Sequence, residues 1–258
     1  IINGGFDVWQ RGTSFTGVSN GVYTADRWLS NISGNWNVSK DNGYKIVAGA
    51  TPTFIYLNTR LEEPNKLSLK TVTLSFTIDS SINTTILVRD RINGSGSVVR
   101  DTVSISIGKN TYTTSYQIAD YSSYTSVSDY YQLELLFGNA YTVPTGAIFI
   151  VSNVQLEEGS VATPFEQRPY GLELSLCQRY YESHIPSTTS NIHGTEYSVT
   201  AYIATYYFKV KKRVIPTITQ SIGSGTLQST QHSENVATWI FTAAAAAYIT
   251  SLTADAEL

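Results

Sequence analysis

A two-residue alternation of apolar and hydroxyl side chains, recurring in several short segments, most constrains how this chain can fold. In Thr71–Ile78, every second residue is apolar and the residues between are Thr or Ser. Successive residues of a β-strand point to opposite faces of a sheet, so this pattern predicts strands with one buried face. Val103–Ile107 and Tyr131–Phe137 repeat it, and the apolar run Ala147–Val151 predicts a strand covered on both faces.

Turn signals and composition extend this prediction to the whole chain. The sequence pairs Asn20-Gly21 and Asn42-Gly43 and the run Asn93–Ser97 separate the predicted strands. Of 258 residues, 30 are Ser, 32 are Thr and 18 are Tyr, whereas charged residues make up only 14%. Many short strands separated by such turns predict an all-β chain whose N-terminal part is a jelly-roll β-sandwich.

The pattern changes after residue 163. Pro164 and Pro169 predict an extended strap, because Pro disfavours helix in the residue before it. Leu172–Glu182 is the only predicted helix, and Leu172, Leu176 and Tyr180 recur on it every four residues. A helix this short must pack on something, either the adjoining domains or copies of itself. We therefore predict a jelly roll at 1–163, a strap plus helix at 164–183 and a smaller β domain at 184–258, with the helix stripe at a trimer interface.

The C-terminal part is expected to be β-rich. Tyr197–Val210 and Thr238–Thr242 predict strands, and Ala243–Ala247 between β-rich segments predicts a strand that another layer can approach closely. The basic run of Lys209, Lys211, Lys212 and Arg213 is interpreted as a solvated strand and its exit turn, although it could instead meet an acidic polymer.

Charge and hydropathy exclude two classes of partner. The net charge is −3 and the isoelectric point about 5.6, which argues against nucleic-acid binding. We expect no membrane insertion, because no apolar run approaches about 18 residues. The single cysteine, Cys177, excludes an internal disulfide.

Enzyme signatures are sparse. The three histidines lie in polar, loop-like contexts, and no nucleophile elbow or phosphate-cradling loop occurs. Asp90 and Asp101 are a candidate acid–base pair across the turn at 93–97. Asp7 and Glu157 or Glu158 are candidate ligands for a structural calcium ion, with solvated or capping carboxylates as the simpler interpretation. No other cofactor is expected.

The tyrosines are the best candidates for side chains that contact a ligand. Tyr121, Tyr124 and Tyr130 lie in a stretch with few charges and many turn residues, so they are the candidate glycan-stacking residues. The alternative is that these rings face the core or a subunit interface. A surface so poor in charge predicts binding that survives salt.

Several segments together carry a resemblance to a known family. These segments are Asn3–Gly12 (NGGFDVWQRG), Tyr23–Trp28 (YTADRW), Val154–Gly159 (VQLEEG), Ala162–Tyr170 (ATPFEQRPY), Leu172–Glu182 with its CQRYYE, Phe208–Thr219 (FKVKKRVIPTIT) and Ala254–Leu258 (ADAEL). In this order they resemble a family of bacteriophage and prophage tail proteins that begins with a carbohydrate-binding-module-like jelly roll.

The resemblance implies a virion tail-fibre component. It implies a homotrimer that is assembled in the host cytoplasm beside other tail proteins and contacts capsule or lipopolysaccharide outside the target cell. It implies no catalytic residues and an architectural role for the motif residues. These are Phe6, Trp9, Arg11, Asp26, Arg27 and Trp28. Two alternatives remain open: a capsule-degrading depolymerase, and a purely structural tail or adhesin module.

Overall fold

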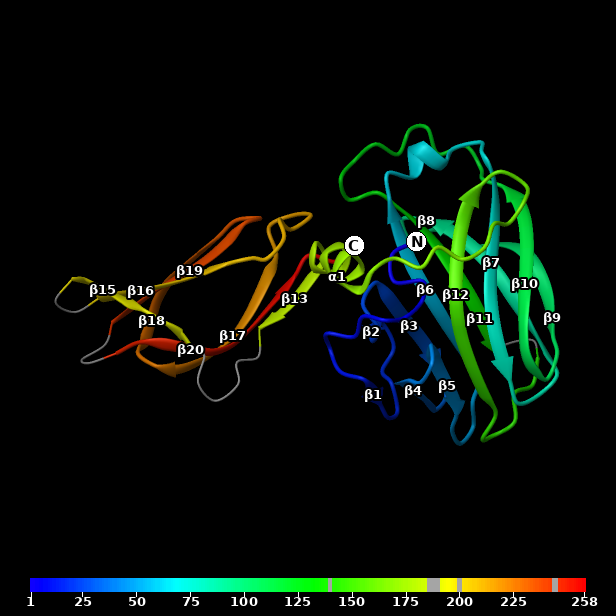
Figure 1. Cartoon of the computed structure of the whole chain (residues 1–258), viewed down its shortest axis with the longest axis horizontal. Coiled ribbons are helices and arrows are strands. Elements are labelled where there is room, and N and C mark those ends of the chain that lie inside the picture. Colours follow the sequence, from blue (N-terminus) through cyan, green and yellow to red (C-terminus); the bar gives the residue numbers. More distant parts are fainter. Residues whose placement is uncertain (139–140, 185–190, 199–200, 243–245) are drawn as a thin grey trace. The chain divides into compact units, whose positions relative to one another are not determined.

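For the residues that it describes, the computed structural model confirms an all-β chain with one short α-helix. It describes residues 1–138, 141–184, 191–198, 201–242 and 246–258. The described chain forms two compact units, the first comprising Ile1–Tyr170 with Leu258 and the second Gly171–Glu257 (Figure 1). In the described residues, no helix is long and apolar enough to cross a membrane.

The first unit consists of two antiparallel six-stranded sheets. Sheet A has the order β1 (Ser14–Phe15), β4 (Trp36–Lys40), β5 (Tyr44–Ala48), β12 (Ile148–Glu158), β7 (Thr71–Ser80) and β10 (Gly108–Gln117). Sheet B has the order β2 (Val22–Tyr23), β3 (Trp28–Ser33), β6 (Phe54–Glu62), β11 (Tyr130–Gly138), β8 (Thr84–Ile92) and β9 (Val98–Ile105). A short 3₁₀ helix, η1 (Pro64–Leu67), links β6 to β7. From β5 to β12 the chain passes repeatedly between the sheets, which gives the predicted jelly-roll sandwich.

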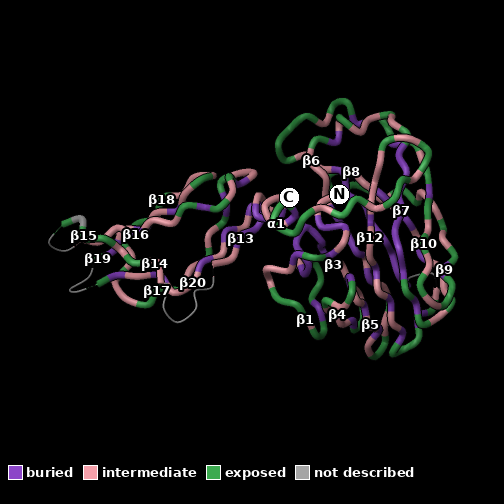
Figure 2. Tube along the Cα trace, viewed as in Figure 1, coloured by how far each residue is buried: buried purple, intermediate pink, exposed green. Residues whose placement is uncertain are grey.

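One hydrophobic core fills the space between the two sheets. Its largest fully buried side chains include Trp28, Trp36, Phe76, Phe137 and Phe149. Figure 2 shows the buried stretches along the strands and the exposed ones in the connecting loops. The alternation predicted at Thr71–Ile78 is confirmed in β7, whose apolar positions all join this core.

Two local strand predictions are corrected or refined by the sheets. The run Ala147–Val151 is not covered on both faces, because Phe149 and Val151 are buried while Ile148 and Ile150 are only half-buried. The turn after β8 has positive φ at both Asn93 (46°) and Gly94 (71°). Asn and Gly adopt this conformation most easily, so the turn signal correctly marked the hairpin.

The N-terminal motif is architectural, as the resemblance implied. The Asn3 side chain is fully buried and donates to the carbonyls of Val8 (2.8 Å) and Asp26 (2.9 Å), while Trp28 Nε1 donates to the Asn3 carbonyl (2.9 Å). The buried Asp26 carboxylate accepts the Gln10 backbone N–H (3.0 Å). Because the buried side chains of Asn3, Asp26 and Trp28 are all hydrogen-bonded, they fix the entry of the chain into the sandwich.

The helix is shorter than predicted. Helix α1 spans Tyr170–Gln178 rather than Leu172–Glu182, because the residues that follow form β13 (Tyr181–His184), which pairs with β20. Leu172 is exposed and Leu176 half-buried, but Tyr180 is only 4% exposed within a single chain. Tyr180 therefore offers little surface to another subunit, and the trimer stays a prediction.

The second unit packs two four-stranded sheets around a smaller core. Sheet C contains β13, β14 (Ile192–His193), β17 (Thr217–Ser224) and β20 (Tyr248–Asp255), with β20 paired to the other three. Sheet D has the order β15 (Thr195–Ser198), β16 (Ala201–Tyr207), β19 (Val236–Thr242) and β18 (Thr226–His232). The core joins Trp239 and Phe241 of sheet D to Ile249 and Leu252 of sheet C.

The strand predictions for this unit hold only in part. The single strand predicted at Tyr197–Val210 is divided between β15 and β16. In the predicted strand at Ala243–Ala247, residues 243–245 lie outside the described residues, and the described remainder precedes β20 without belonging to it.

The basic run after β16 forms no strand, and only Lys209 and Lys211 in it are exposed as predicted. Lys212 is completely buried, and its Nζ donates to Glu182 Oε2 at 2.6 Å and to the Gln178 carbonyl. Glu182 also accepts the Tyr206 hydroxyl (2.7 Å). A buried lysine must be paired, and here its partners come from the CQRYYE segment. Lys212 therefore cannot meet an external polymer. The two family-like segments are instead parts of one internal network.

Candidate functional site: the arginine–tyrosine face of sheet B

The outer face of sheet B carries a group of polar and aromatic side chains. Strand alternation sends Leu57 of β6 and Leu133 and Leu135 of β11 into the core, so their neighbours point outward. We name the outward group the arginine–tyrosine face. It comprises Tyr56, Asn58 and Arg60 of β6, Arg89 and Arg91 of β8, and Tyr130, Gln132 and Glu134 of β11. The sheet order β6-β11-β8 makes these three strands neighbours.

A buried carboxylate organises the centre of this face. Glu134 is fully buried and lies opposite Asn58 in one register and Arg89 in the other. Its Oε1 accepts the side chains of Arg91 and Gln132, the latter at 2.8 Å, and its Oε2 lies 3.6 Å from Arg89 Nε. One carboxylate thus orients two guanidinium groups. Glu62 lies on the same side of β6 as Arg60 and opposite Tyr130, so this side of sheet B has three arginines against two glutamates.

Guanidinium groups cover both tyrosine rings of the face. The Arg89 guanidinium lies 5.2 Å from the Tyr56 ring centroid and donates to the Tyr56 hydroxyl (3.0 Å). The Arg60 guanidinium lies 4.5 Å from the Tyr130 ring centroid and donates to Gln132 Oε1 (2.9 Å). Flat rings next to planar donors are well suited to hold a ligand with both apolar ring faces and polar edges.

Asn58 is the unusual member of the face. It is fully buried, and neither its amide oxygen nor its amide nitrogen has a hydrogen-bond partner among the described residues. Its neighbours across the sheet are Leu29 and Glu134. Leaving such a group unpaired costs about 1–3 kcal/mol, so a buried, unpaired amide calls for an explanation.

The structure places the three predicted tyrosines in two different surroundings. Tyr121 is 7% exposed and belongs to the core, and Tyr124 packs edge-on against it with centroids 5.9 Å apart. The Tyr121 ring is therefore not a surface platform. Tyr130 is half-buried and belongs to the arginine–tyrosine face.

The candidate acid–base pair is not assembled. The β8–β9 register places Val98 opposite Asp90 and Asp101 opposite Val88, so the two carboxylates are not cross-strand partners. Asp90 is fully buried and accepts Arg100 Nε (2.8 Å) and the Tyr131 hydroxyl (3.1 Å). Burial raises the pKa of Asp90. This network lies inside the sandwich.

The candidate calcium ligands are engaged locally or exposed. The Glu157 carboxylate accepts the backbone N–H (3.0 Å) and the hydroxyl of Thr163, and the hydroxyl bond lowers its pKa. Asp7 is exposed. Across the ranges that the structure describes, no group of three or more His, Cys, Asp or Glu side chains is placed to hold a metal ion. The calcium site stays a prediction.

Most of the face was missed by sequence reasoning. The usable signal was the polar side of otherwise apolar strands: Gln132 and Glu134 alternate with leucines, and Arg89 and Arg91 flank a buried position. The leucines of β11 predict its buried side, and the polar side chains between them were given no role. Which strands adjoin β11 depends on sheet order, and local patterns do not contain that order.

Comparisons with known proteins identify similar folds at low similarity. No family model matches the chain, and no curated protein matches it. Among solved structures, one described as "CBM4 structure and function" has 19% identity and a TM-score of 0.44, covering 61% of this chain and 98% of its own. A carbohydrate binding module of family 29 has 15% identity and a TM-score of 0.35, covering 57% and 88%.

A phage protein also appears among the similar structures. The enzymatically active domain of tailspike protein 4 from bacteriophage CBA120 has 14% identity and a TM-score of 0.38. The match covers 55% of this chain and 21% of that one.

Proposed function

We propose that the chain is a non-catalytic receptor-binding protein that holds a bacterial surface polysaccharide on the arginine–tyrosine face. The observation that carries this is the unpaired, buried amide of Asn58 on a face where guanidinium groups lie over two tyrosine rings. Amides, guanidinium groups and rings are the groups that bond sugar hydroxyls and cover sugar ring faces. Glu134 is already bound to arginine and Gln132, which favours binding over acid–base catalysis.

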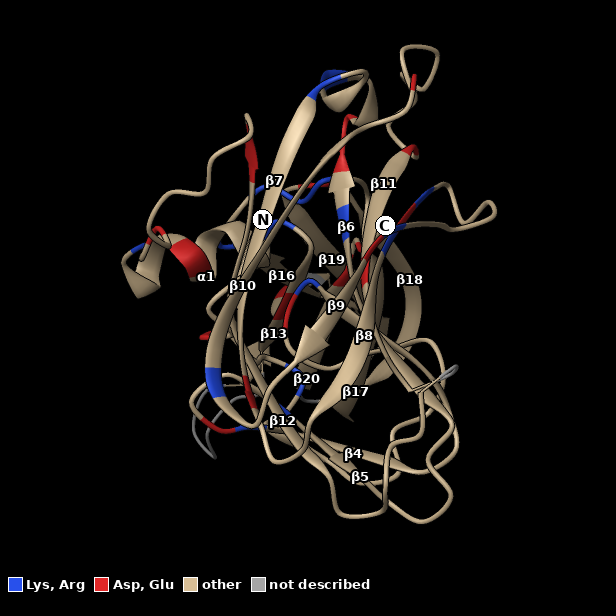
Figure 3. Ribbon diagram, turned by 90° about the vertical axis from the view of Figure 1, so that its right-hand side faces the viewer, with Lys and Arg blue, Asp and Glu red and all other residues tan. Residues whose placement is uncertain are grey.

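We further propose that the polysaccharide is acidic. Three arginines against two glutamates, Glu134 and Glu62, leave an excess of one positive charge on this side of sheet B, on a chain whose net charge is −3. Figure 3 marks the basic residues of the chain in blue and the acidic ones in red. Guanidinium groups pair well with carboxylates and phosphates, which occur in capsules and lipopolysaccharide. An acidic ligand should therefore bind less tightly as salt rises, whereas the composition alone predicted binding that survives salt.

The biological setting is part of the same proposal. The family-like segments support a place in a phage tail as a homotrimer beside other tail proteins, and the exposed Leu172 is available for a subunit contact. Mass spectrometry of purified virions tests the location. Light scattering tests the assembly, with three times 28.4 kDa expected and a stable single-chain mass contradicting it.

The binding test compares alginate, a polyuronic acid, with neutral dextran. We expect the protein to bind alginate at about 50 mM salt and to bind less at about 500 mM, because small ions screen exposed charge. Arg60→Gln should weaken binding at least about tenfold, since bonds to charged groups contribute about 1.5–3 kcal/mol.

The control removes a positive charge elsewhere. Lys109 is exposed on β10 of sheet A, so Lys109→Gln should bind alginate like the wild type. Equal losses in both variants would mean that net charge, rather than this face, holds the polymer. Shortening of host capsule during incubation, measured by gel filtration, would support the depolymerase alternative instead.

A further inference from the structure

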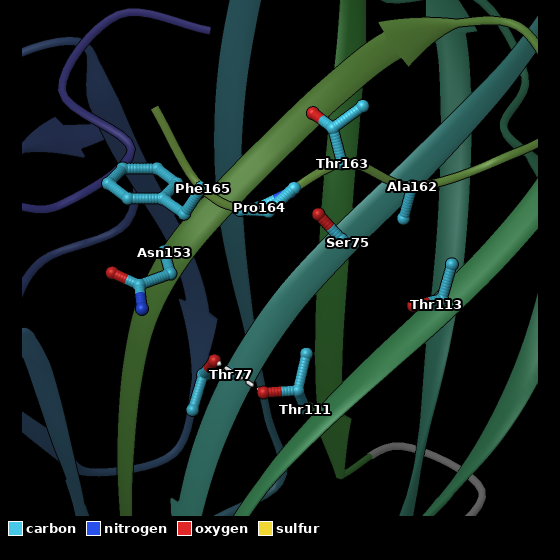
Figure 4. A pocket seen from close by; sticks show the side chains of 9 residues that line it. All are labelled: Ser75, Thr77, Thr111, Thr113, Asn153, Ala162, Thr163, Pro164 and Phe165. Atoms are coloured by element: carbon cyan, nitrogen blue, oxygen red, sulfur yellow. Dashed lines mark hydrogen bonds between the residues drawn. The ribbon is translucent and has the colours of Figure 1, made fainter. Parts of the chain in front are cut away.

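A separate hollow lies on the outer face of sheet A, on the other side of the sandwich from the arginine–tyrosine face. It has a volume of about 260 Å³. Strands β7, β10 and β12 form its floor, and residues 162–165 of the strap form its wall (Figure 4). All of these elements belong to the first unit.

The lining of this hollow is polar but uncharged. Its polar side chains are those of Ser75, Thr77, Thr111, Thr113, Asn153 and Thr163. The remaining lining residues are Ala162, Pro164 and Phe165, so one aromatic ring contributes to the wall. With no charged residue among the nine, a charged ligand would gain no ion pair here.

Three of the polar side chains are free to bond a ligand. The hydroxyls of Thr77 and Thr111 bond each other across the strands at 3.0 Å. By contrast, the side chains of Ser75, Thr113 and Asn153 have no hydrogen-bond partner in the described part of the chain, and Ser75 is only 8% exposed. These groups together supply donors and acceptors on adjoining strands.

A β-bulge directs Asn153 to this position. The register of β12 with β7 shifts between Ser152 and Gln155, and Asn153 adopts a left-handed φ of 54°. A bulge re-aims side chains out of the regular alternation. Gly4 anchors the bulge, because its carbonyl accepts the Val154 N–H (2.9 Å) and a Cβ on it would lie 2.0 Å from the Val154 carbonyl oxygen.

The wall is fixed before any ligand arrives. Glu157 holds the N–H and hydroxyl of Thr163, and Gln155 accepts the Glu166 N–H (2.8 Å) while its Nε2 donates to the Pro164 carbonyl (3.4 Å). Because the wall is already ordered, ligand binding costs less conformational entropy.

We propose that this hollow binds one uncharged sugar ring. Its volume lies just below the range of about 300–1,000 Å³ that is usual for small-molecule sites, so it fits a single ring rather than a chain. The free hydroxyls and amide match sugar hydroxyls, and the Phe165 ring offers an apolar surface to the carbon face of a sugar. This site stands independently of the arginine–tyrosine face. It would let one protein hold a neutral branch and an acidic backbone at separate places.

The test uses saturation-transfer NMR on the full chain with methyl glycosides. The neutral probes are those of glucose, galactose, mannose and N-acetylglucosamine, and that of glucuronic acid is the charged comparison. We expect transfer to at least one neutral glycoside, unchanged by salt, and little to the charged one. The Ser75→Ala/Thr113→Val double variant should reduce the transfer at least about tenfold, because it removes both free hydroxyls.

Controls separate this site from general effects and from the other face. Thr71→Val makes the same type of change on the same strand outside the hollow, so it should retain wild-type transfer. Arg60→Gln should also retain it, even if alginate binding fails. Absence of transfer to all four neutral probes, or equal transfer in the double variant and the wild type, overturns the proposal. Matching thermal unfolding curves confirm that the variants fold.

Discussion

Replacing Asn58 with leucine should make the protein more stable and, at the same time, unable to bind its polysaccharide. Asn58 is fully buried, and within the part of the chain that the structure describes both polar atoms of its amide are unpaired. Leucine has a similar size and branching, so Asn58→Leu removes the unpaired atoms with little change in shape. It would also place an apolar side chain beside Leu29, its neighbour across the sheet.

The magnitude follows from the two groups involved. Burying an unsatisfied polar group costs about 1–3 kcal/mol, and replacing it with a similarly shaped apolar group removes that cost. Imperfect packing of the new side chain returns up to about 1.5 kcal/mol. We therefore expect the free energy of unfolding to rise by about 1–2 kcal/mol. For a unit of this size, that is an increase in Tm of about 2–8 °C.

Scanning calorimetry measures the transition of the first unit, and alginate binding is measured on the same samples. The matched control is Asn31→Leu. Asn31 is half-buried on β3 and points to the same side of sheet B as Asn58, and we expect its replacement to change stability by no more than about 0.5 kcal/mol. If Asn58→Leu lowers stability by more than about 1 kcal/mol, the amide is bonded in the native protein and the reasoning fails. If the variant is stabilised but still binds alginate normally, Asn58 is not a ligand contact.

Three further predictions concern stability. Lys212→Met should lower the free energy of unfolding by about 3–5 kcal/mol, because it leaves the Glu182 carboxylate buried without its cation. Urea titration should show that the double variant Lys212→Met/Glu182→Leu recovers most of this loss. Burial raises the pKa of Tyr44 to about 12, so stability present below pH about 10 should fall by about 2–3 kcal/mol as pH rises through 12, and urea midpoints across this range should fall less in Tyr44→Phe. Gly34→Ala should lower Tm, because φ is +85° and the new Cβ would lie 2.3 Å from the Thr51 carbonyl oxygen; an unchanged Tm would show that this turn relaxes freely.

The sheet sandwich could be predicted because its signal is local. In β7 and β11, apolar residues at every second position are enough to define a buried face. The Asn93-Gly94 turn was readable for the same reason, since its conformation depends on those two residues. The end of α1 was misplaced because Tyr181–His184 is held as a strand by β20, about 70 residues further along the chain.

The candidate sites were less predictable because they depend on neighbours that are distant in sequence. Arg60, Arg89 and Glu134 meet only because β11 lies between β6 and β8. Tyr121 illustrates the opposite difficulty, since no local pattern reports that its ring joins the core. The hollow on sheet A needed both a bulge at Asn153 and a strap crossing β7, and neither appears in the alternation.

The central place of β20 in sheet C has a consequence for synthesis on the ribosome. Strands β13, β14 and β17 all pair with β20, which is made after them. Nascent chains grow at about 5–20 residues per second, and the jelly roll can close while the second unit is still emerging. The other strands of sheet C must then wait, with their pairing edges open, until residue 255 has left the exit tunnel. A message truncated upstream of β20 would therefore yield a folded sandwich attached to an unfinished sheet, which proteases can recognise and remove.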